Sequence, residues 1–258
     1  MHQWTPFPHA GAYPFDAATV RDQWPRLHAG DVEPPPENTR VAEAWALFHS
    51  GAFQQARDAG LRAGGSAGTF VANMATCIYA CHLEKREDLR LELLMEVAER
   101  ARRQCEEDAT NPNAWYSQAY ALGRYSQSIS IAKSLAQGLG KRIKDALEKT
   151  IQLQPAHANA HIALGTFHAE VIDKLGPLIA GMTYGARKET GLQLFESARR
   201  LNPTSAVALR ACAKGLLMLE GPHKHAEARQ LYERAAGTPP QDAKEWLDAD
   251  LARAELEN

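Results

Sequence analysis

From Thr39 onward, apolar side chains recur at intervals of three and four residues and polar ones fill the positions between them. This spacing is typical of amphipathic helices. One pattern of small residue, aromatic ring, small residue and proline occurs twice at the same offsets: Gly191, Phe195, Ala198 and Pro203, then Ala228, Tyr232, Ala235 and Pro240. No segment shows the sustained alternation of a β-strand, so the sequence predicts an all-α fold.

Prolines mark the ends of these helical patterns at intervals of about 40 residues, which is a repeat length that solenoids use. The four dipeptides concerned are Asn111-Pro112, Gln154-Pro155, Asn202-Pro203 and Pro239-Pro240. Small residues let two helices approach closely, an aromatic ring fills the gap, and proline stops the helix. The recurrence therefore predicts stacked helical hairpins, whose extended surface favours binding over catalysis.

The periodicity predicts eleven helices, the first of which can be capped by Asn38 or Thr39 and is ended by Gly51. They span 39–50, 53–63, 69–84, 87–109, 113–133, 139–153, 157–173, 187–201, 204–220, 224–236 and 241–256. The last one has an apolar stripe with Trp246 and Leu251 and a charged outer face. This is the pattern of a helix that caps the end of a stacked array.

These repeats resemble tetratricopeptide (TPR) repeats, most closely over 112–240. Trp115 stands at the aromatic position of one first helix, and Leu164-Gly165 matches the Leu-Gly pair of the next. The resemblance implies an all-α, right-handed α-α superhelical solenoid of four to five hairpins over residues 39–258. The stretch AHIALGTFHAEV and the insertion after it are also similar to repeat proteins of the regulator-of-microtubule-dynamics type.

Residues 1–38 differ from the rest because they are rich in both proline and aromatic residues. Prolines at this density oppose a helix of useful length. The aromatic residues are too numerous for a solvated tail, which is normally poor in them. We expect either a disordered leader or an extended arm that buries its rings against the helical array.

Composition excludes several classes of function. A formal net charge of −2 gives no reason to expect a nucleic-acid partner. No apolar run approaches the roughly 20 residues that a membrane span requires. The four cysteines show neither disulfide-scaffold nor zinc spacing, and the N-terminus lacks the features of a signal peptide. A cytosolic protein without cofactors is the expectation.

Two groups of residues could carry chemistry. His157, His161 and His168 lie near one face of a predicted helix, where the first pair could share a metal. Packed core imidazoles are the alternative, because two of the three occupy inter-helix positions. The string AQGLGKR at 136–142 partly matches a phosphate-binding loop, but it follows a helical pattern and lacks the final Ser or Thr. Neither group predicts an enzyme.

The TPR resemblance implies a concave groove lined by exposed positions of each first helix. Carried over to this chain, the groove positions are Tyr116, Tyr120, Arg124, Asn159, Ile162, Thr166, Arg210 and Lys214. Rings with a few basic groups favour an extended peptide that carries hydrophobic or aromatic side chains. The alternative is that the protein's own N-terminal arm fills the groove.

The insertion at 173–188 combines glycines with apolar residues that should not be exposed to water. Its contact candidates are Leu178, Ile179, Met182 and Tyr184. The segment either folds over the edge of its own array or contacts a partner, a second copy or a membrane edge. A weaker counterpart lies at 126–140.

Three functions follow from these observations. The leading one is a non-enzymatic cytosolic scaffold that binds a protein or peptide segment in its groove. A second is a structural homo-oligomer joined through the 173–188 insertion or the N-terminal arm. A third is a metal- or small-ligand-binding protein that uses the His157/His161 face.

Overall fold

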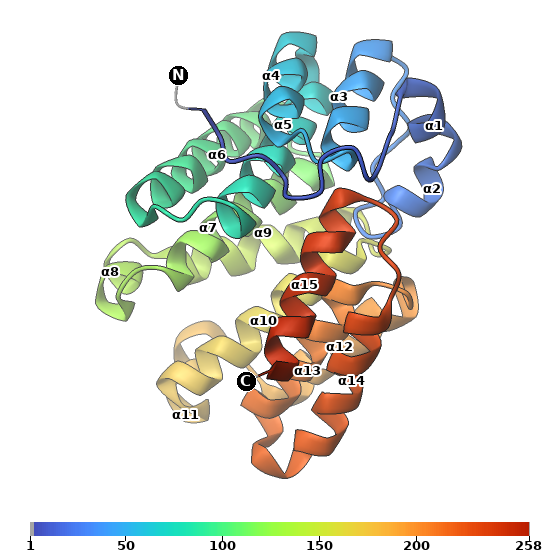
Figure 1. The fold of residues 1–258 in the computed structure, drawn as a ribbon. Helices are drawn as coiled ribbons and strands as arrows, with labels where there is room; N and C mark the ends of the chain where they lie inside the picture. The colour runs from blue at the N-terminus through green and yellow to red at the C-terminus, as the bar shows by residue number, and fades with distance from the viewer. Residues whose placement is uncertain (1–2, 258) are drawn as a thin grey trace. The chain divides into compact units, whose positions relative to one another are not determined.

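The computed structural model describes residues 3–257 and contains only helices and loops within that range (Figure 1). The α-helices are α1 (Ala17–Asp22), α2 (Trp24–Leu27), α3 (Thr39–His49), α4 (Phe53–Ala63), α5 (Gly65–His82), α6 (Glu87–Glu107), α7 (Pro112–Gln127), α8 (Ile131–Ala136), α9 (Leu139–Leu153), α10 (Ala158–Leu175), α11 (Pro177–Tyr184), α12 (Lys188–Leu201), α13 (Ala206–Glu220), α14 (His225–Gly237) and α15 (Ala243–Glu257). A short 3-10 helix, η1 (Pro222–Lys224), precedes α14. The prediction of an all-α fold is confirmed.

The chain forms two compact units. The first contains residues 1–28, 33–153 and 241–244. Its core is three successive hairpins, α3–α4, α5–α6 and α7–α9, in which each second helix also packs on the first helix of the next hairpin. The first helices contact one another as well, α3 with α5 and α5 with α7. Hairpins stacked in this way are the building plan of a solenoid.

The second unit contains residues 29–32, 154–240 and 245–258. It repeats the plan with two hairpins, α10–α12 and α13–α14, and the first helices α10 and α13 pack on each other. Most of α15 belongs to this unit, and its Ala252 joins a buried cluster with Ala206 and Tyr232. The predicted closing helix is therefore present and packs against the last hairpin.

Aromatic rings fill the gaps between helices where the repeat pattern places them. Phe195 is 2% exposed, and its ring lies against Gly165 of α10 and Gly215 of α13. A Cβ atom on Gly215 would lie only 2.2 Å from the ring, and one on Gly165 would lie 3.0 Å from it. Tyr232 is buried at the equivalent position of the next hairpin. Because Gly165 and Gly215 have no side chains, the Phe195 ring fits between their helices.

The insertions are helical, which the sequence pattern did not predict. The expected helix at 113–133 ends at Gln127, and α8 follows as a separate element. The expected loop at 173–188 contains α11, which begins at Pro177 and ends where Gly185 adopts a left-handed backbone with φ +64°. Both short helices lie between the first and second helix of one hairpin. They account for the residues beyond the usual repeat length.

The N-terminal segment lies on the first unit and is not wholly extended. Trp4, Phe7 and Trp24 are buried, and the prolines leave room for α1 and α2. Asp16 starts α1 with a capping box that it shares with Thr19, an arrangement that satisfies two backbone N–H groups. The sequence predicted an arm without a helix of useful length. The Asp16 cap instead stabilises a short helix within it.

Replacing Phe195 by Ala is expected to lower the free energy of unfolding by about 3–5 kcal/mol, because the ring leaves a cavity between two rigid backbones. Chemical denaturation followed by circular dichroism measures this change. Leu178→Ala is the matched control, since that side chain is 74% exposed and its loss should change stability by less than about 0.5 kcal/mol. Equal stabilities for the two variants would contradict the packing described here.

Candidate protein-binding surfaces

In the first unit, α7 carries three of the predicted groove residues on one face. Asn111 caps the helix by accepting hydrogen bonds from the backbone N–H groups of its first turn. The rings of Tyr116 and Tyr120 lie 5.9 Å apart, and the guanidinium carbon of Arg124 lies 5.1 Å from the centroid of the Tyr120 ring. Tyr120 and Arg124 are half-buried, whereas Tyr116 is only 4% exposed. Tyr116 is therefore a packing residue next to Tyr120 and is not accessible to a partner.

Two thiols of α5 belong to the same neighbourhood. Burial raises the pKa of Cys81, although Arg124 and a hydrogen bond with Tyr120 act in the opposite direction. Burial also raises the pKa of Cys77 well above its ordinary value. Tyr120 in turn raises the pKa of Arg124, which keeps this cation charged. The thiols are thus protonated packing groups, and Arg124 carries the charge of the face.

In the second unit, the predicted α10 positions differ in accessibility. The backbone N–H of Asn159 donates to the carbonyl of Gly30 at 2.9 Å, and the Asn159 side chain lies where a Cβ atom on Gly30 would be. A segment of the chain's own N-terminal region therefore covers this position. Ile162 is 8% exposed and packs with Ala198, so its expected exposure is wrong. Thr166 is half-buried.

The helix α13 carries two basic residues at predicted groove positions. Lys214 is exposed. Arg210 is half-buried, and one of its terminal nitrogens lies 3.8 Å from a carboxylate oxygen of Glu255 on α15. The Nε atom of Arg210 is buried and has no hydrogen-bond partner among the described residues. These two cations mark the first-helix face of the last hairpin.

The insertion helix α11 directs three large apolar side chains outward. Leu178 is 74% exposed, Ile179 55% and Met182 81%. Tyr184 instead turns inward, and its ring meets Phe167 at 5.9 Å in an edge-on arrangement. Four candidates of one predicted group thus have two roles: Tyr184 anchors the helix, and the other three present an apolar surface.

The histidines have structural partners. His157 is fully buried and caps α10, because its Nδ1 accepts from the backbone N–H of Ala160 at 3.0 Å. His168 is buried, and its Nδ1 accepts from the backbone N–H of Arg187. His161 contacts the carbonyl of Pro155 at 3.0 Å. Within residues 3–257, no three His, Cys, Asp or Glu side chains converge as a metal site requires.

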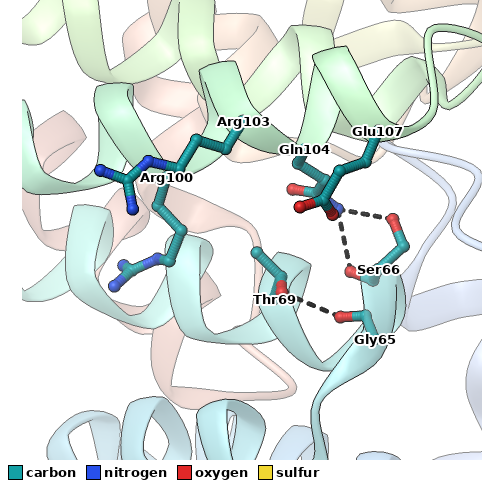
Figure 2. A pocket seen from close by; sticks show the side chains of 7 residues that line it. All are labelled: Gly65, Ser66, Thr69, Arg100, Arg103, Gln104 and Glu107. Atoms are coloured by element: carbon teal, nitrogen blue, oxygen red, sulfur yellow. Dashed lines mark hydrogen bonds between the residues drawn. The ribbon is translucent and has the colours of Figure 1, made fainter.

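A small polar cavity of about 230 Å³ lies between the start of α5 and the end of α6 (Figure 2). Its polar groups are largely engaged with one another. The Gln104 amide donates to the Ser66 carbonyl and hydroxyl, and Thr69 donates to the Gly65 carbonyl. Arg100 is ion-paired with Glu96 on its own helix. The cavity is below the usual size of an organic-ligand pocket, and no predicted site residue lines it.

The string at 136–142 joins two helices. It contains the end of α8, the left-handed Gly138 and the first residues of α9. A phosphate-binding loop instead connects a strand to a helix. This segment therefore serves as a helix–helix turn.

Comparison with known proteins identifies the family. The sequence profile described as "Regulator of microtubule dynamics protein 1-3" matches residues 47–257, which is most of the chain. The chain belongs to the regulator of microtubule dynamics protein 1-3 family. The profile begins within α3 and extends through α15, so it covers all five hairpins except the start of the first.

One solved structure supports the fold of this family member, and a second is reported beside it. A thermophilic TPR protein from Thermus thermophilus, TTC0263, aligns with a TM-score of 0.58 at 13% identity and covers 83% of this chain and 97% of its own. MamA MSR-1 C2 aligns with a TM-score of 0.41 at 15% identity, covering 84% of this chain and 95% of its own. The first alignment confirms a TPR-like solenoid fold. No curated protein gives a significant match.

The structure also brings together residues that the sequence pattern did not single out. Arg57 and Tyr79 contact the indole of Trp4, and Gln54 accepts a hydrogen bond from the Trp4 backbone N–H. They come from two different helices and share no spacing motif, so only the unusual aromatic content of the N-terminal segment pointed to such a contact.

In the described part of the chain, no helix is long and apolar enough to cross a bilayer.

The buried cap His157 makes stability depend on pH. Burial lowers its pKa to about 4, below the ordinary value of 6.5. The unfolded chain therefore binds a proton first, and stability that is fully present above pH 6.5 is lost as the pH falls towards 4. His157→Asn, which keeps a capping oxygen, should reduce the loss of unfolding free energy between pH 7 and pH 5 by on the order of 1–2 kcal/mol.

Denaturant titrations at the two pH values measure that loss. His225→Asn, at an exposed position, is the control and should behave as the wild type. If His157→Asn shows the same pH dependence of stability as the wild type, His157 is not the source of that dependence.

Proposed function

We propose that this family member is a non-enzymatic scaffold that binds a protein segment on the first-helix faces of its hairpins. The observation that carries the proposal is the Tyr120–Arg124 pair, a half-exposed ring beside a charged guanidinium. Tyrosine and arginine are the residues that most often dominate binding energy at protein interfaces. The TPR-like fold supplies rigid helices that hold such a pair in place.

The chemistry of these faces favours a partner of a particular kind. In the first unit, Tyr120 offers a flat apolar surface and Arg124 offers positive charge beside it. In the second unit, Arg210 and Lys214 form a separate positively charged face on α13. An extended segment with aromatic or aliphatic side chains and nearby carboxylates would match both properties. Thr166 is half-buried and offers a hydroxyl group, whereas Asn159 is covered by Gly30. Nucleic acid does not match, because the chain as a whole is close to neutral.

The cytosol is the compartment we propose for this activity. The four cysteines, at positions 77, 81, 105 and 212, are free thiols in the structure, which suits a reducing environment. The family name refers to microtubule dynamics. A scaffold that holds a protein segment is compatible with that role, and it requires neither a metal nor a cofactor.

A double substitution, Tyr120→Ala with Arg124→Ala, is expected to reduce the capture of specific partners at least tenfold. Loss of about 2 kcal/mol at each of two interface anchors would suffice for this reduction. Quantitative mass spectrometry of proteins captured by purified wild type and variant measures the change. The melting temperature of the variant should be checked in parallel, since both side chains are half-buried.

Arg103→Ala is the matched control, because this arginine lies on α6 with 68% of its side chain exposed. Its capture profile should equal that of the wild type. If the double variant retains every partner that the wild type captures, the α7 face is not the binding surface.

Self-association through α11 is a second candidate function. The specific observation is the outward direction of Leu178, Ile179 and Met182 on one eight-residue helix. Contiguous exposed apolar side chains of this kind mark contact surfaces in soluble proteins. A second copy of the chain could cover them by pairing the same helix.

Met182→Lys is expected to convert a self-associated species into a monomer, because it places a charge at the most exposed position of the apolar surface. Light scattering after size-exclusion chromatography measures the mass. Lys141→Glu, at an exposed position of α9, serves as the control and should leave the mass unchanged. A wild-type protein that is monomeric at high concentration would end this second candidate.

A further inference from the structure

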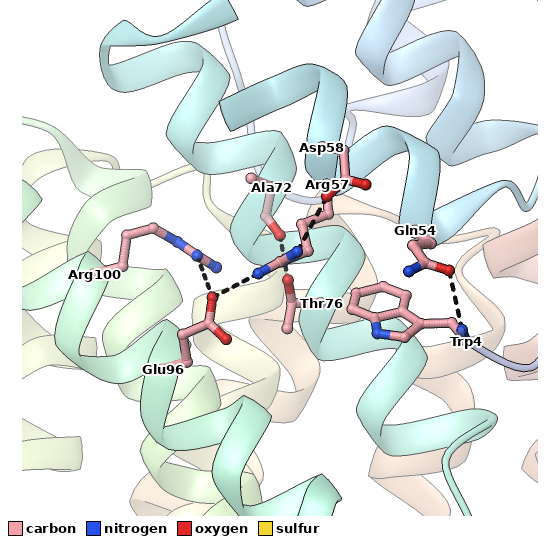
Figure 3. A network of polar contacts seen from close by, with 8 residues as sticks. All are labelled: Trp4, Gln54, Arg57, Asp58, Ala72, Thr76, Glu96 and Arg100. Carbon is pink, nitrogen blue, oxygen red and sulfur yellow. Dashed lines mark hydrogen bonds and ion pairs between the residues drawn. The ribbon is translucent and has the colours of Figure 1, made fainter. Parts of the chain in front are cut away.

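The first unit holds the N-terminal segment as a protein holds a bound peptide. The indole of Trp4 stacks on Tyr79 with ring centroids 4.1 Å apart and planes 8° from parallel. The guanidinium carbon of Arg57 lies 5.9 Å from the centroid of the same indole. Figure 3 shows the indole lying beside Arg57 and close to Gln54. Trp4 is thereby reduced to 9% exposure.

A second ring of the segment has its own site. Phe7 is 3% exposed and lies over Gly51, where a Cβ atom would come within 2.7 Å of the ring. The Phe7 ring thus packs directly on the backbone at Gly51. We call the group of Gln54, Arg57, Tyr79 and Gly51 the Trp4 seat.

The two buried rings are three positions apart, and the residues between them are exposed. Residues 3–7 form neither helix, strand nor turn, and Pro6 and Pro8 favour the polyproline II conformation. That helix has three residues per turn, so side chains three positions apart share a face. The motif Trp-Thr-Pro-Phe-Pro is therefore preorganised to present both rings to one surface.

The seat also recognises backbone groups. The N–H of Trp4 donates to Oε1 of Gln54 at 3.0 Å, and the N–H of Thr5 donates to the Tyr79 hydroxyl at 3.3 Å. Further along, the N–H of Phe15 donates to the hydroxyl of Ser50 at 3.2 Å. Side chains that accept from backbone N–H groups bind an extended segment whatever its own side chains are. The rings then provide the selectivity.

Contacts within the helical array hold the seat in place. The Tyr79 hydroxyl donates to Glu84 at 2.7 Å, and Arg86 binds the same carboxylate. These partners lower the pKa of Glu84 to about 2. Arg57 is ion-paired with Glu96 at 3.0 Å, and Glu96 is shared with Arg100 (Figure 3). The seat residues thus have fixed partners other than the N-terminal segment.

The connection that follows the two rings is an exposed turn, closed by a hydrogen bond from the backbone N–H of Ala12 to the carbonyl of His9. Residues 8–12 are all exposed, and a Cβ atom on Gly11 would meet nothing within 4 Å. The anchored part is therefore short and separated from the rest by an open turn. Such a segment leaves its site at a lower free-energy cost than the helices around it.

From this geometry we infer that the Trp4 seat is a peptide-recognition site whose resting occupant is the chain's own N-terminal segment. Its partner is a protein segment of the same chemistry, an extended, proline-containing stretch with an indole ring and a phenyl ring three positions later. The seat lies outside the α7 and α13 faces, so the inference goes beyond the function proposed above. The tethered segment competes at a high effective concentration, typically millimolar, and thereby keeps weak partners out.

The test uses the full-length chain and a fluorescent synthetic peptide with the sequence of residues 3–15. In the Trp4→Ala variant the seat is intact but poorly occupied, so fluorescence anisotropy should show at least tenfold tighter peptide binding than to the wild type. A peptide in which the Trp4 position is Ala should not bind. Adding Arg57→Ala and Tyr79→Phe to the Trp4→Ala chain should abolish the gain.

Trp115→Ala is the control, since this half-buried indole lies on α7 outside the seat, and it should bind the peptide as weakly as the wild type. Phe7→Ala weakens the arm at its other ring and provides a second variant if Trp4→Ala does not fold. Equal peptide affinity in the wild type and both folded arm variants would overturn the inference. So would a gain that survives the Arg57 and Tyr79 substitutions.

Discussion

The structure depends on the close approach of helices at positions that lack a side chain, with one aromatic ring in the space this creates. Phe195 shows the constraint most directly, because a Cβ atom on Gly215 would lie only 2.2 Å from its ring, and one on Gly165 would make a tight contact at 3.0 Å. Close packing of this kind fixes the distance between neighbouring helices. In the second unit, this contact holds the first helices α10 and α13 at a fixed distance, which is what a preorganised binding surface needs.

Much of this arrangement was predictable from sequence. Small, aromatic and proline residues at fixed offsets gave the hairpins and placed Phe195 and Tyr232 in the core. Exposure was less predictable: Ile162 sits at a groove position of the TPR pattern yet packs against Ala198. Asn159 is covered by Gly30, a residue remote in sequence. Local periodicity carries no information about such a distant neighbour, and the same is true of Arg57 beside Trp4.

The two kinds of surface differ in how they are prepared for a partner. The α7 face presents a ring and a cation that already contact each other, so binding would require little rearrangement. The Trp4 seat is filled in the structure, so a partner must first replace the segment that occupies it. Affinity at such a site is reduced by the fraction of molecules in which it is open. One chain can thus combine an immediately accessible surface with one that responds only to a strong competitor.

The hydrogen bond between Asn159 and Gly30 has a consequence for biosynthesis. Residues 29–32 belong to the same compact unit as residues 154–240, and residues 241–244 belong to the unit that contains residues 33–153. Neither unit is therefore continuous along the chain. On the ribosome, the segment at residues 29–32 must wait until Asn159 has emerged before its hydrogen-bond partner exists. Closing such long loops slows folding, so the nascent chain would expose incomplete packing surfaces for longer than an ordinary repeat array.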